Sequence, residues 1–387
     1  MSLSRILFVG YLWPGSTCVP RLNGLRAIGL DVQVLDATGW AKGPSRLVNS
    51  IGQRLYCTQE IRRMNEKLIE AAGQVKPDLV WLEKGNWAYP STLRRLREHA
   101  RFLVHYNTDD VLTLGSWFWL HRAGIRLYDI HLTTNRWNVH EIRKRYGVRT
   151  MRVGMGYDQD FHRPPSLPSW SDASVQVVFV GHWEIHTEKY VGALRESGLV
   201  IEVWGHNWWR AKDRALRSVK PLGQGEYVNK IASAKIALCS LSRRNRNEST
   251  GRSFEIPAIG TFLLAERSLE HEFLFGDGSG AALFTGEEEL VEKAHRYLAR
   301  EEARCSVAAK GHALCRSLGL SWGDHIRREW ALVCDFLLQG KVGDDRDADT
   351  PFWPGFRLGE AAPLGGRTER ATATKTAVGE TLEVSER

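Results

Sequence analysis

The sequence lacks three features that would each have assigned it to a distinct class of protein. No stretch approaches the roughly 18 consecutive apolar residues of a membrane-spanning helix. The apolar run near the N-terminus is too short for a secretory signal peptide, and no A-x-A-like cleavage site follows it. The six cysteines are scattered without a C-x-x-C pair. We therefore expect a cytoplasmic protein with free thiols, rather than a disulfide framework or a cysteine zinc site.

The composition is that of a globular protein with room for more than one core. Of its 387 residues, 43% are hydrophobic and 25% are charged, as in ordinary folded domains. A chain of this length is long for one core and comfortable for two domains of common size. Fifteen tryptophans are many, and core packing is the commoner explanation for them than a ligand surface.

The net charge of +8 is unevenly distributed along the chain. Residues 1–165 hold 24 Lys and Arg against 14 Asp and Glu, whereas the remainder holds 29 against 31. The basic first half suggests an anionic partner such as a membrane surface or a phosphorylated acceptor, and a solvated basic face is the alternative. The basic residues form no recognised nucleic-acid motif, so we expect no nucleic-acid partner.

The first half alternates between buried strands and amphipathic helices. Ile6–Val9 is apolar throughout, as in a parallel sheet buried on both faces, and a helical face and a second strand at 31–37 follow. Further strands are predicted at 78–85, 102–110, 129–135 and 148–156, with helices at 59–74, 91–98 and 137–146. Such alternation predicts a doubly wound parallel sheet, a Rossmann-like domain spanning residues 1–165.

A proline- and serine-rich stretch at 162–174 reads as a linker, after which the same alternation restarts. We predict a second Rossmann-like domain at 166–340, whose last helix, 322–339, crosses back to the first domain. Residues 341–387 are charged and then rich in Gly, Ala and Thr, which predicts a disordered tail. Two such domains in series place a cleft at the carboxyl ends of both sheets.

The stretch "RSFEIPAIGTFLLAE" at 252–266 places two charged residues, Arg252 and Glu255, in a largely apolar run. We predict that Ser253 caps a short helix ending at Gly260, so that both charges lie at the helix N-terminus. Helix amides and a guanidinium together bind phosphate, and a carboxylate accepts hydrogen bonds from both hydroxyls of a ribose. The alternative is that Glu255 only complements the helix dipole, with Arg252 as its surface partner.

The chain resembles a family of sugar-transferring enzymes along most of its length. "GRSFEIPAIGTFLLAE" is similar to the signature of glycosyltransferases with two Rossmann domains, the GT-B fold. The segments "ILFVGYLWPGST", "DLVWLEKG", "HYNTDD", "GMGYDQDFHRP" and "VVFVGHWEIHTEKYVGALRESG" follow the order of the spore-protein CgeB/YkvP-like glycosyltransferases. This resemblance covers roughly residues 4–335 and implies a nucleotide-sugar donor as substrate, with no cofactor and no metal ion.

The resemblance implies a donor site in the second domain. Glu255 would hold the donor ribose and Arg252 the diphosphate. The other donor-side residues that it implies are Thr250, Ser253, Gly181, His182 and Gly205. Retaining members of the fold have a second glutamate where this chain has Asn247, with Glu248 one position off, so the stereochemistry stays open.

On the acceptor side, the loop Gly15-Ser16-Thr17 would line the cleft, although a plain β-α turn is the alternative. Asp109 or Asp110 would be the general base that deprotonates the acceptor hydroxyl, although a capping pair is the alternative. The acceptor would be a cell-surface polysaccharide, a lipid-linked glycan or a protein, with peripheral membrane contact through the basic first domain as one candidate. A nucleotide-sugar epimerase and a non-catalytic scaffold remain alternative functions.

Overall fold

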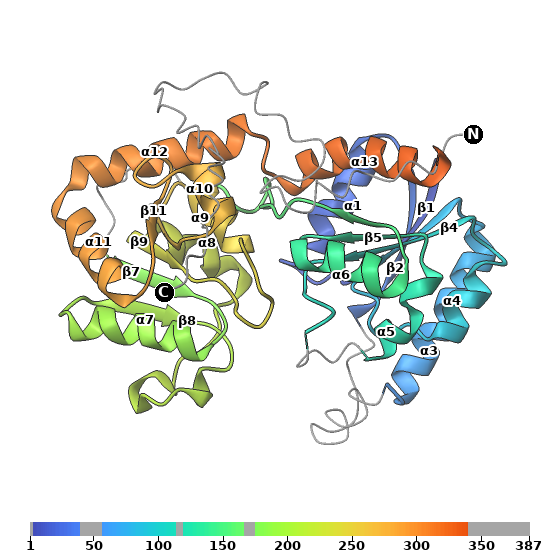
Figure 1. Ribbon diagram of the computed structural model, residues 1–387, viewed down its shortest axis with the longest axis horizontal. Coiled ribbons are helices and arrows are strands. Elements are labelled where there is room, and N and C mark those ends of the chain that lie inside the picture. The colour runs from blue at the N-terminus through green and yellow to red at the C-terminus, as the bar shows by residue number, and fades with distance from the viewer. Residues whose placement is uncertain (1–2, 39–55, 114–118, 166–174, 340–387) are drawn as a thin grey trace, which may run out of the picture. The chain divides into compact units, whose positions relative to one another are not determined.

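The computed structural model describes residues 3–38, 56–113, 119–165 and 175–339 and contains two parallel β-sheets, each with its own helices (Figure 1). Both sheets belong to one compact unit. The predicted tail at 341–387, and the predicted linker beyond residue 165, lie outside the described residues. Within the described ranges, no helix combines the length and the hydrophobicity needed to cross a bilayer.

The first sheet has six parallel strands in the order β2-β1-β3-β4-β5-β6. Its strands are β1 (Arg5–Gly10), β2 (Asp31–Asp36), β3 (Leu79–Glu83), β4 (Phe102–Asn107), β5 (Ile130–Thr133) and β6 (Thr150–Arg152). Its helices are α1 (Cys18–Ala27), α3 (Gln59–Val75), α4 (Pro90–Leu96), α5 (Trp119–Gly124) and α6 (Arg136–Tyr146). Every residue of β3 is buried, because helices cover both faces of a doubly wound sheet.

The second sheet has five parallel strands in the order β11-β10-β9-β7-β8. Its strands are β7 (Val175–Val180), β8 (Ile201–Trp204), β9 (Ala234–Cys239), β10 (Leu263–Glu266) and β11 (Ala282–Phe284). Its helices are α7 (Ile185–Glu196), α8 (Gln224–Ala232), α9 (Gly251–Ile259), α10 (Leu269–Phe275), α11 (Glu287–Ala299) and α12 (Glu301–Ser317). Both sheets are parallel throughout, which confirms the fold class predicted from the alternating pattern.

Each sheet reverses its winding direction once, and these reversals locate the loops that can bind a ligand. In the first sheet the chain moves from β1 outward to β2 and then to β3 on the other side of β1. In the second sheet it moves from β7 to β8 and then to β9 on the other side of β7. Ligands of doubly wound folds bind at the carboxyl ends of such strand pairs. The loops after β1, β3, β7 and β9 are therefore the first candidates.

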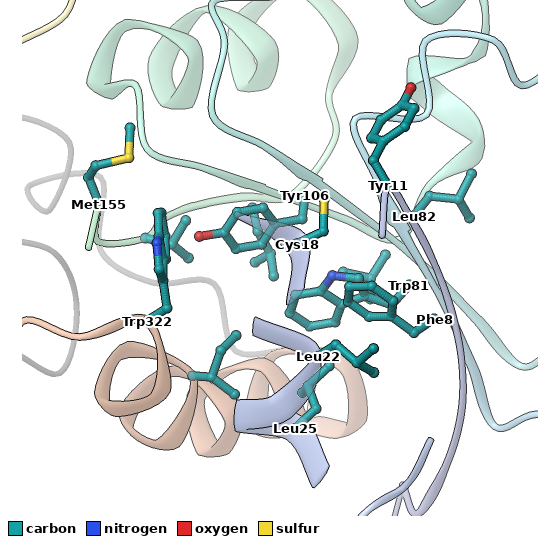
Figure 2. Close-up of a cluster of buried hydrophobic side chains, with 14 of the residues drawn as sticks. Phe8, Tyr11, Cys18, Leu22, Leu25, Trp81, Leu82, Tyr106, Met155 and Trp322 are labelled. Carbon is teal, nitrogen blue, oxygen red and sulfur yellow. The ribbon is translucent and has the colours of Figure 1, made fainter. Parts of the chain in front are cut away.

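The final helix, α13 (Trp322–Gln339), packs on α1 of the first sheet's half. The Arg21 guanidinium carbon lies 4.4 Å from the Tyr106 ring centroid and 4.5 Å from that of Trp322. Figure 2 shows Trp322 beside Tyr106, with Leu22 and Leu25 of α1 in the same cluster. Arg21 also donates to both oxygens of the buried Glu83 carboxylate, at 2.9 and 2.6 Å, so its buried charge is compensated.

Helix α9 begins earlier than the sequence predicted. Ser253 was expected to cap the helix, but the cap is Thr250 and the first helical residue is Gly251. Ser253 lies one turn inside, where its hydroxyl accepts a hydrogen bond from the Thr250 N–H at 2.9 Å. The helix exits at Gly260 with φ +91°, as predicted. Glu255 consequently lies in the second turn rather than at the helix N-terminus.

Gly205 makes the closest backbone approach in the second sheet's half, and we expect its substitution by alanine to destabilise the fold. Its φ is +145°, and an added Cβ would lie 1.8 Å from the Gly181 carbonyl oxygen. Strain and overpacking each cost about 1–3 kcal/mol, so Gly205→Ala should lower the free energy of unfolding in urea by at least about 2 kcal/mol. Gly192→Ala is the matched control: its Cβ would meet nothing within 4 Å, and a helical alanine should stabilise by about 0.5–1 kcal/mol. Equal stability of the two variants would contradict this assignment.

Candidate functional site

A cavity of about 530 Å³ opens at the carboxyl ends of strands from both sheets. The first sheet contributes Thr108 and Asp109, just after β4, and the second contributes His182 after β7. The loop between β9 and α9 and the first two residues of α9 supply much of the remaining lining, namely Ser240, Leu241, Ser242, Arg244, Asn245, Asn247, Thr250, Gly251 and Arg252. The cavity therefore forms where the reversed winding of the second sheet predicts a ligand site.

Asp109 is the carboxylate that the first sheet presents to this cavity. It follows β4, which ends at Asn107, so it lies in a turn and not within the predicted strand at 102–110. Its Oδ2 accepts a hydrogen bond from Lys84 Nζ at 3.1 Å, and its side chain remains 32% exposed. The charge of Asp109 is the largest influence on Lys84 and raises its pKa. Asp109 is thus held by a cation and is still accessible from the cavity.

Asp110, predicted together with Asp109, has a different environment. Its side chain is fully buried, Oδ2 accepts from Arg246 Nε at 2.5 Å, and Oδ1 accepts from the Leu112 N–H at 3.0 Å. Arg246 also donates to both carboxylate oxygens of Glu141, at 2.9 and 3.1 Å. These contacts fix the loop after β9 on the first sheet's half. Asp110 therefore takes part in this contact between the two halves, and Asp109 is the member of the pair that lines the cavity.

Arg252, the second residue of α9, lines the cavity. Its guanidinium forms no hydrogen bond or ion pair with any residue that the structure describes, and its Nε is buried. By contrast, Arg136 lies 2.8 Å from the Glu248 carboxylate, which Arg152 approaches to 3.6 Å. A partly buried cation that the described residues do not compensate is unfavourable unless a ligand supplies the negative charge. The amides of the first turn of α9 add donors for the same anion.

His182 lines the cavity near Arg252, and its ring centroid lies 5.3 Å from that of His206. Burial, followed by the charges of His206 and Arg252, lowers the pKa of His182. Near neutral pH the ring is therefore a neutral hydrogen-bonding group rather than a second cation. It can supply a single hydrogen bond to a ligand beside Arg252.

Three of the predicted donor-side residues line neither this cavity nor the second one, described below, which contains Glu255. Gly181 and Gly205 allow two backbone segments to pass each other, and the Gly181 N–H donates to the Trp204 carbonyl at 2.8 Å. Ser253 is fully buried, with its hydroxyl 2.7 Å from His271 Nε2. Close backbone packing therefore explains the two glycines, and a hydrogen bond within the protein explains the serine.

A second cavity, of about 340 Å³, contains Glu255. It is also lined by the loop after β1, including Gly15, Ser16 and Thr17, and by Asp158, Phe161, His162, Leu222, Gly223, Tyr227 and Trp322. Glu255 Oε2 accepts a hydrogen bond from the Tyr227 hydroxyl at 2.5 Å, and Oε1 lies 3.9 Å from His162 Nε2. Burial, followed by the Glu255 charge, raises the pKa of Tyr227 well above its ordinary value. Tyr227 thus remains a hydrogen-bond donor to Glu255.

The first turns of α9 separate the two cavities. Gly251 lines the first cavity, yet a Cβ added to it would lie only 2.7 Å from Glu255 Oε1 in the second. Arg252 and Glu255 therefore act on adjoining spaces, with the helix N-terminus between them. The structure brings the Gly15–Thr17 loop together with Glu255, whereas the sequence assigned that loop to the acceptor.

Sequence reasoning missed Tyr227 and His162, which complete the environment of Glu255. Tyr227 lies on α8, where it resembled an ordinary helical aromatic residue, and His162 lies at the start of the expected linker. Neither residue has a motif that could have identified it. Glu248, the off-register glutamate, pairs with Arg136 and Arg152, while Asn247 faces the first cavity.

The comparisons with known proteins agree with this geometry. Residues 186–321 match the profile of a family described as glycosyl transferase-like. This segment contains the loop after β9 and all of α9, so Arg252 and Glu255 both lie within it. The match does not confirm the narrower resemblance to the CgeB/YkvP-like family. A search of curated proteins gave no match.

Solved structures of GT-B glycosyltransferases share the fold. Sucrose-phosphate synthase from Thermosynechococcus elongatus matches with a TM-score of 0.61 and 11% identity, over 87% of this chain and 100% of that one. Anabaena HepE, solved in complex with UDP and glucose, matches with a TM-score of 0.56 and 13% identity, over 85% and 99%. A glycosyltransferase from Rickettsia africae gives 0.57 and 9% identity, over 88% and 100%. The chain therefore has the two-sheet α/β fold of GT-B proteins.

Proposed function

We propose that this chain is a glycosyltransferase that moves a sugar from a nucleotide-activated donor to an acceptor hydroxyl. The observation that carries the proposal is Arg252, at the start of α9 and inside the first cavity, whose guanidinium has no counter-ion among the residues that the structure describes. It lies within the segment that matches the glycosyl transferase-like profile. A diphosphate is the ligand that a helix N-terminus and a free guanidinium bind together.

The two cavities suggest how the donor would lie. The diphosphate would occupy the first turn of α9, held by Arg252 and by the backbone at Thr250 and Gly251. The nucleoside would extend into the second cavity, where the Glu255 carboxylate would accept hydrogen bonds from both ribose hydroxyls. The sugar would extend into the first cavity, toward Asp109. HepE, a protein of the same fold, was crystallised with UDP and with UDP-glucose, which supports a nucleotide sugar as the ligand class.

In this arrangement, the acceptor hydroxyl oxygen would attack the anomeric carbon while the bond from that carbon to the diphosphate breaks. The hydroxyl proton would pass to Asp109 if the enzyme inverts, and negative charge would develop on the departing diphosphate. Arg252 and the amides of α9 would stabilise that charge, which is the largest electrostatic task in such a reaction. We propose no cofactor for this step beyond the donor itself.

The acceptor stays a prediction of the sequence. A cell-surface polysaccharide, a lipid-linked glycan and a protein each provide a suitable hydroxyl. The basic first half, with 24 Lys and Arg against 14 Asp and Glu in residues 1–165, favours an acceptor or a surface that carries negative charge. A cytoplasmic location with peripheral membrane contact is consistent with such an acceptor.

Calorimetric titration of UDP, GDP, CDP and dTDP tests the donor site directly. We expect one nucleotide to bind the wild type, and we expect Glu255→Ala to weaken it by roughly tenfold or more, about 1.4 kcal/mol. The loss arises because two ribose hydroxyls lose their acceptor. Glu196→Ala, at an exposed position on α7, is the control and should bind as the wild type does.

If no nucleotide binds the wild type at millimolar concentration, the transferase proposal fails and a scaffold function replaces it. If Glu255→Ala binds with unchanged affinity, the donor site stands but its ribose contact must be sought elsewhere. An epimerase would convert the donor sugar without any acceptor, which incubation with the nucleotide sugar alone would detect.

A further inference from the structure

Three buried histidines meet in the core of the first sheet's half, and none of them lines either cavity. His105 on β4 and His131 on β5 are directly paired in the register of the two strands, and His121 on α5 lies beside them. Each is only 1% exposed. One ring nitrogen from each residue can be chosen so that the three lie within 4.8 Å of one another. The centroid of the His121 ring lies 4.1 Å from that of His105.

The hydrogen-bond partners of His105 and His131 require more protons than two neutral rings possess. His105 Nε2 lies 2.9 Å from the Lys84 carbonyl oxygen, and His131 Nε2 lies 3.0 Å from that of Ile125. A carbonyl only accepts, so both Nε2 atoms must carry hydrogen. The two Nδ1 atoms face each other at 2.9 Å. With both Nε2 atoms protonated, each Nδ1 of a neutral ring carries a lone pair, so this contact needs a third proton or another cation between the two nitrogens.

A neutral pair supplies two protons for these three contacts, so every tautomer leaves one contact between two lone pairs. A cation removes the conflict, and it can be a third proton or a metal ion. A third proton would place a positive charge on a fully buried ring, which is costly. A metal ion instead gains coordination bonds from several nitrogens, which offset the burial of its charge.

We propose that His105, His121 and His131 bind one divalent transition-metal ion, with Zn²⁺ as the first candidate. Imidazole nitrogens suit Zn²⁺ and its neighbours in the first transition row and do not suit Mg²⁺ or Ca²⁺. Nitrogens on one tetrahedral Zn²⁺ lie about 3.4 Å apart, so the facing Nδ1 atoms would separate slightly. His121, on the six-residue helix α5, would move inward to become the third ligand.

The two outer nitrogens already have the partners that metal-bound histidines use. Each Nε2 faces a backbone carbonyl oxygen, and such contacts fix the tautomer and the orientation of the ring. Lys84 has a left-handed backbone conformation, with φ +62°, and its carbonyl oxygen faces His105. The Lys84 ammonium pairs with Asp109 at 3.1 Å. The ion would thus support the turn that holds Asp109, although its binding does not depend on the proposed transferase function.

The test is the metal content of the full-length protein, expressed in zinc-supplemented medium, freed of any affinity tag and measured by elemental analysis. We expect about one Zn²⁺ per chain in the wild type and in His140→Gln, an exposed histidine on α6. His131→Gln should lose it. Chelator-treated wild type titrated with Co²⁺ alone should develop the visible absorption bands of nitrogen-coordinated Co²⁺ and regain its melting temperature.

The Co²⁺ titration keeps the proposal testable if His131→Gln fails to fold. Absence of any divalent ion from the wild type, together with no spectral or thermal response to Co²⁺ or Zn²⁺, would overturn it in favour of a shared proton. Full metal content in a folded His131→Gln would also overturn it, because the ion would then lie elsewhere. Nucleotide affinity is measured separately, so failure here leaves the donor site unaffected.

Discussion

Replacing Asp109 with asparagine should lower the rate of sugar transfer by about 10²–10⁴-fold, the usual contribution of a general base. Asparagine keeps the size and the hydrogen-bonding capacity of the side chain but cannot accept the acceptor proton. Asp109 faces the first cavity and is still 32% exposed beside Lys84. Nucleotide affinity should stay within about threefold, under 1 kcal/mol, because the diphosphate and ribose contacts lie on α9.

The measurement compares kcat with the calorimetric nucleotide affinity for Asp109→Asn and two further variants. Asp335→Asn, at an exposed position on α13 that lines neither cavity, should transfer sugar at the wild-type rate. Asp110→Asn should lower thermal stability, because its carboxylate is buried against Arg246. A wild-type rate in Asp109→Asn combined with a large loss in a folded Asp110→Asn would reverse the assignment of the base.

Arg252→Gln should reduce kcat/KM by about 10²–10³-fold, comparable with the loss of one preorganised transition-state donor. The guanidinium contributes a full positive charge beside the helix N-terminus, whereas glutamine contributes a dipole alone. The effect should exceed that of Glu255→Ala, because charge increases on the departing diphosphate but not on the ribose. Stability should be maintained or should rise slightly, since the variant removes a partly buried cation that has no protein counter-ion among the described residues.

Steady-state kinetics together with urea unfolding measure both consequences in the same protein. Arg296→Gln, at an exposed position on α11, is the matched control and should leave both quantities unchanged. Arg252→Lys should recover part of the activity, since it restores the charge but not the planar fork. Unaltered kcat/KM in Arg252→Gln would remove the main support for a diphosphate at α9.

The element pattern was predictable because parallel sheets are covered by helices on both faces. Strands such as β3, with every residue buried, appear in the sequence as continuous apolar runs between amphipathic segments. The ends of the helices and strands were harder to predict from the sequence. The strand predicted at 102–110 ends at Asn107, and the helix predicted to begin at Ser253 begins at Gly251, because local hydrogen bonds decide where an element stops.

The sequence predicted individual residues of the candidate site but not the contacts between them. The sequence selected Arg252, Glu255 and Asp109, and the structure places each of them against a cavity. It could not separate Asp109 from its neighbour Asp110, because contacts between distant segments distinguish the two carboxylates, such as that of Asp110 with Arg246, 136 residues away in the chain. It could not identify Tyr227 either, because the pairing with Glu255 joins two different helices.

By itself, the sequence determined the fold class and the charged residues of α9, because hydrophobic periodicity and helix signals are local properties of the chain. Only the tertiary structure decided which residues meet. Three contacts between separate segments illustrate this. They are the close approach of Gly205 to Gly181, the ion pairs of Glu248, and the facing nitrogens of His105 and His131. Such contacts depend on strand order and on close approach between segments, and periodicity within a segment carries no information about either.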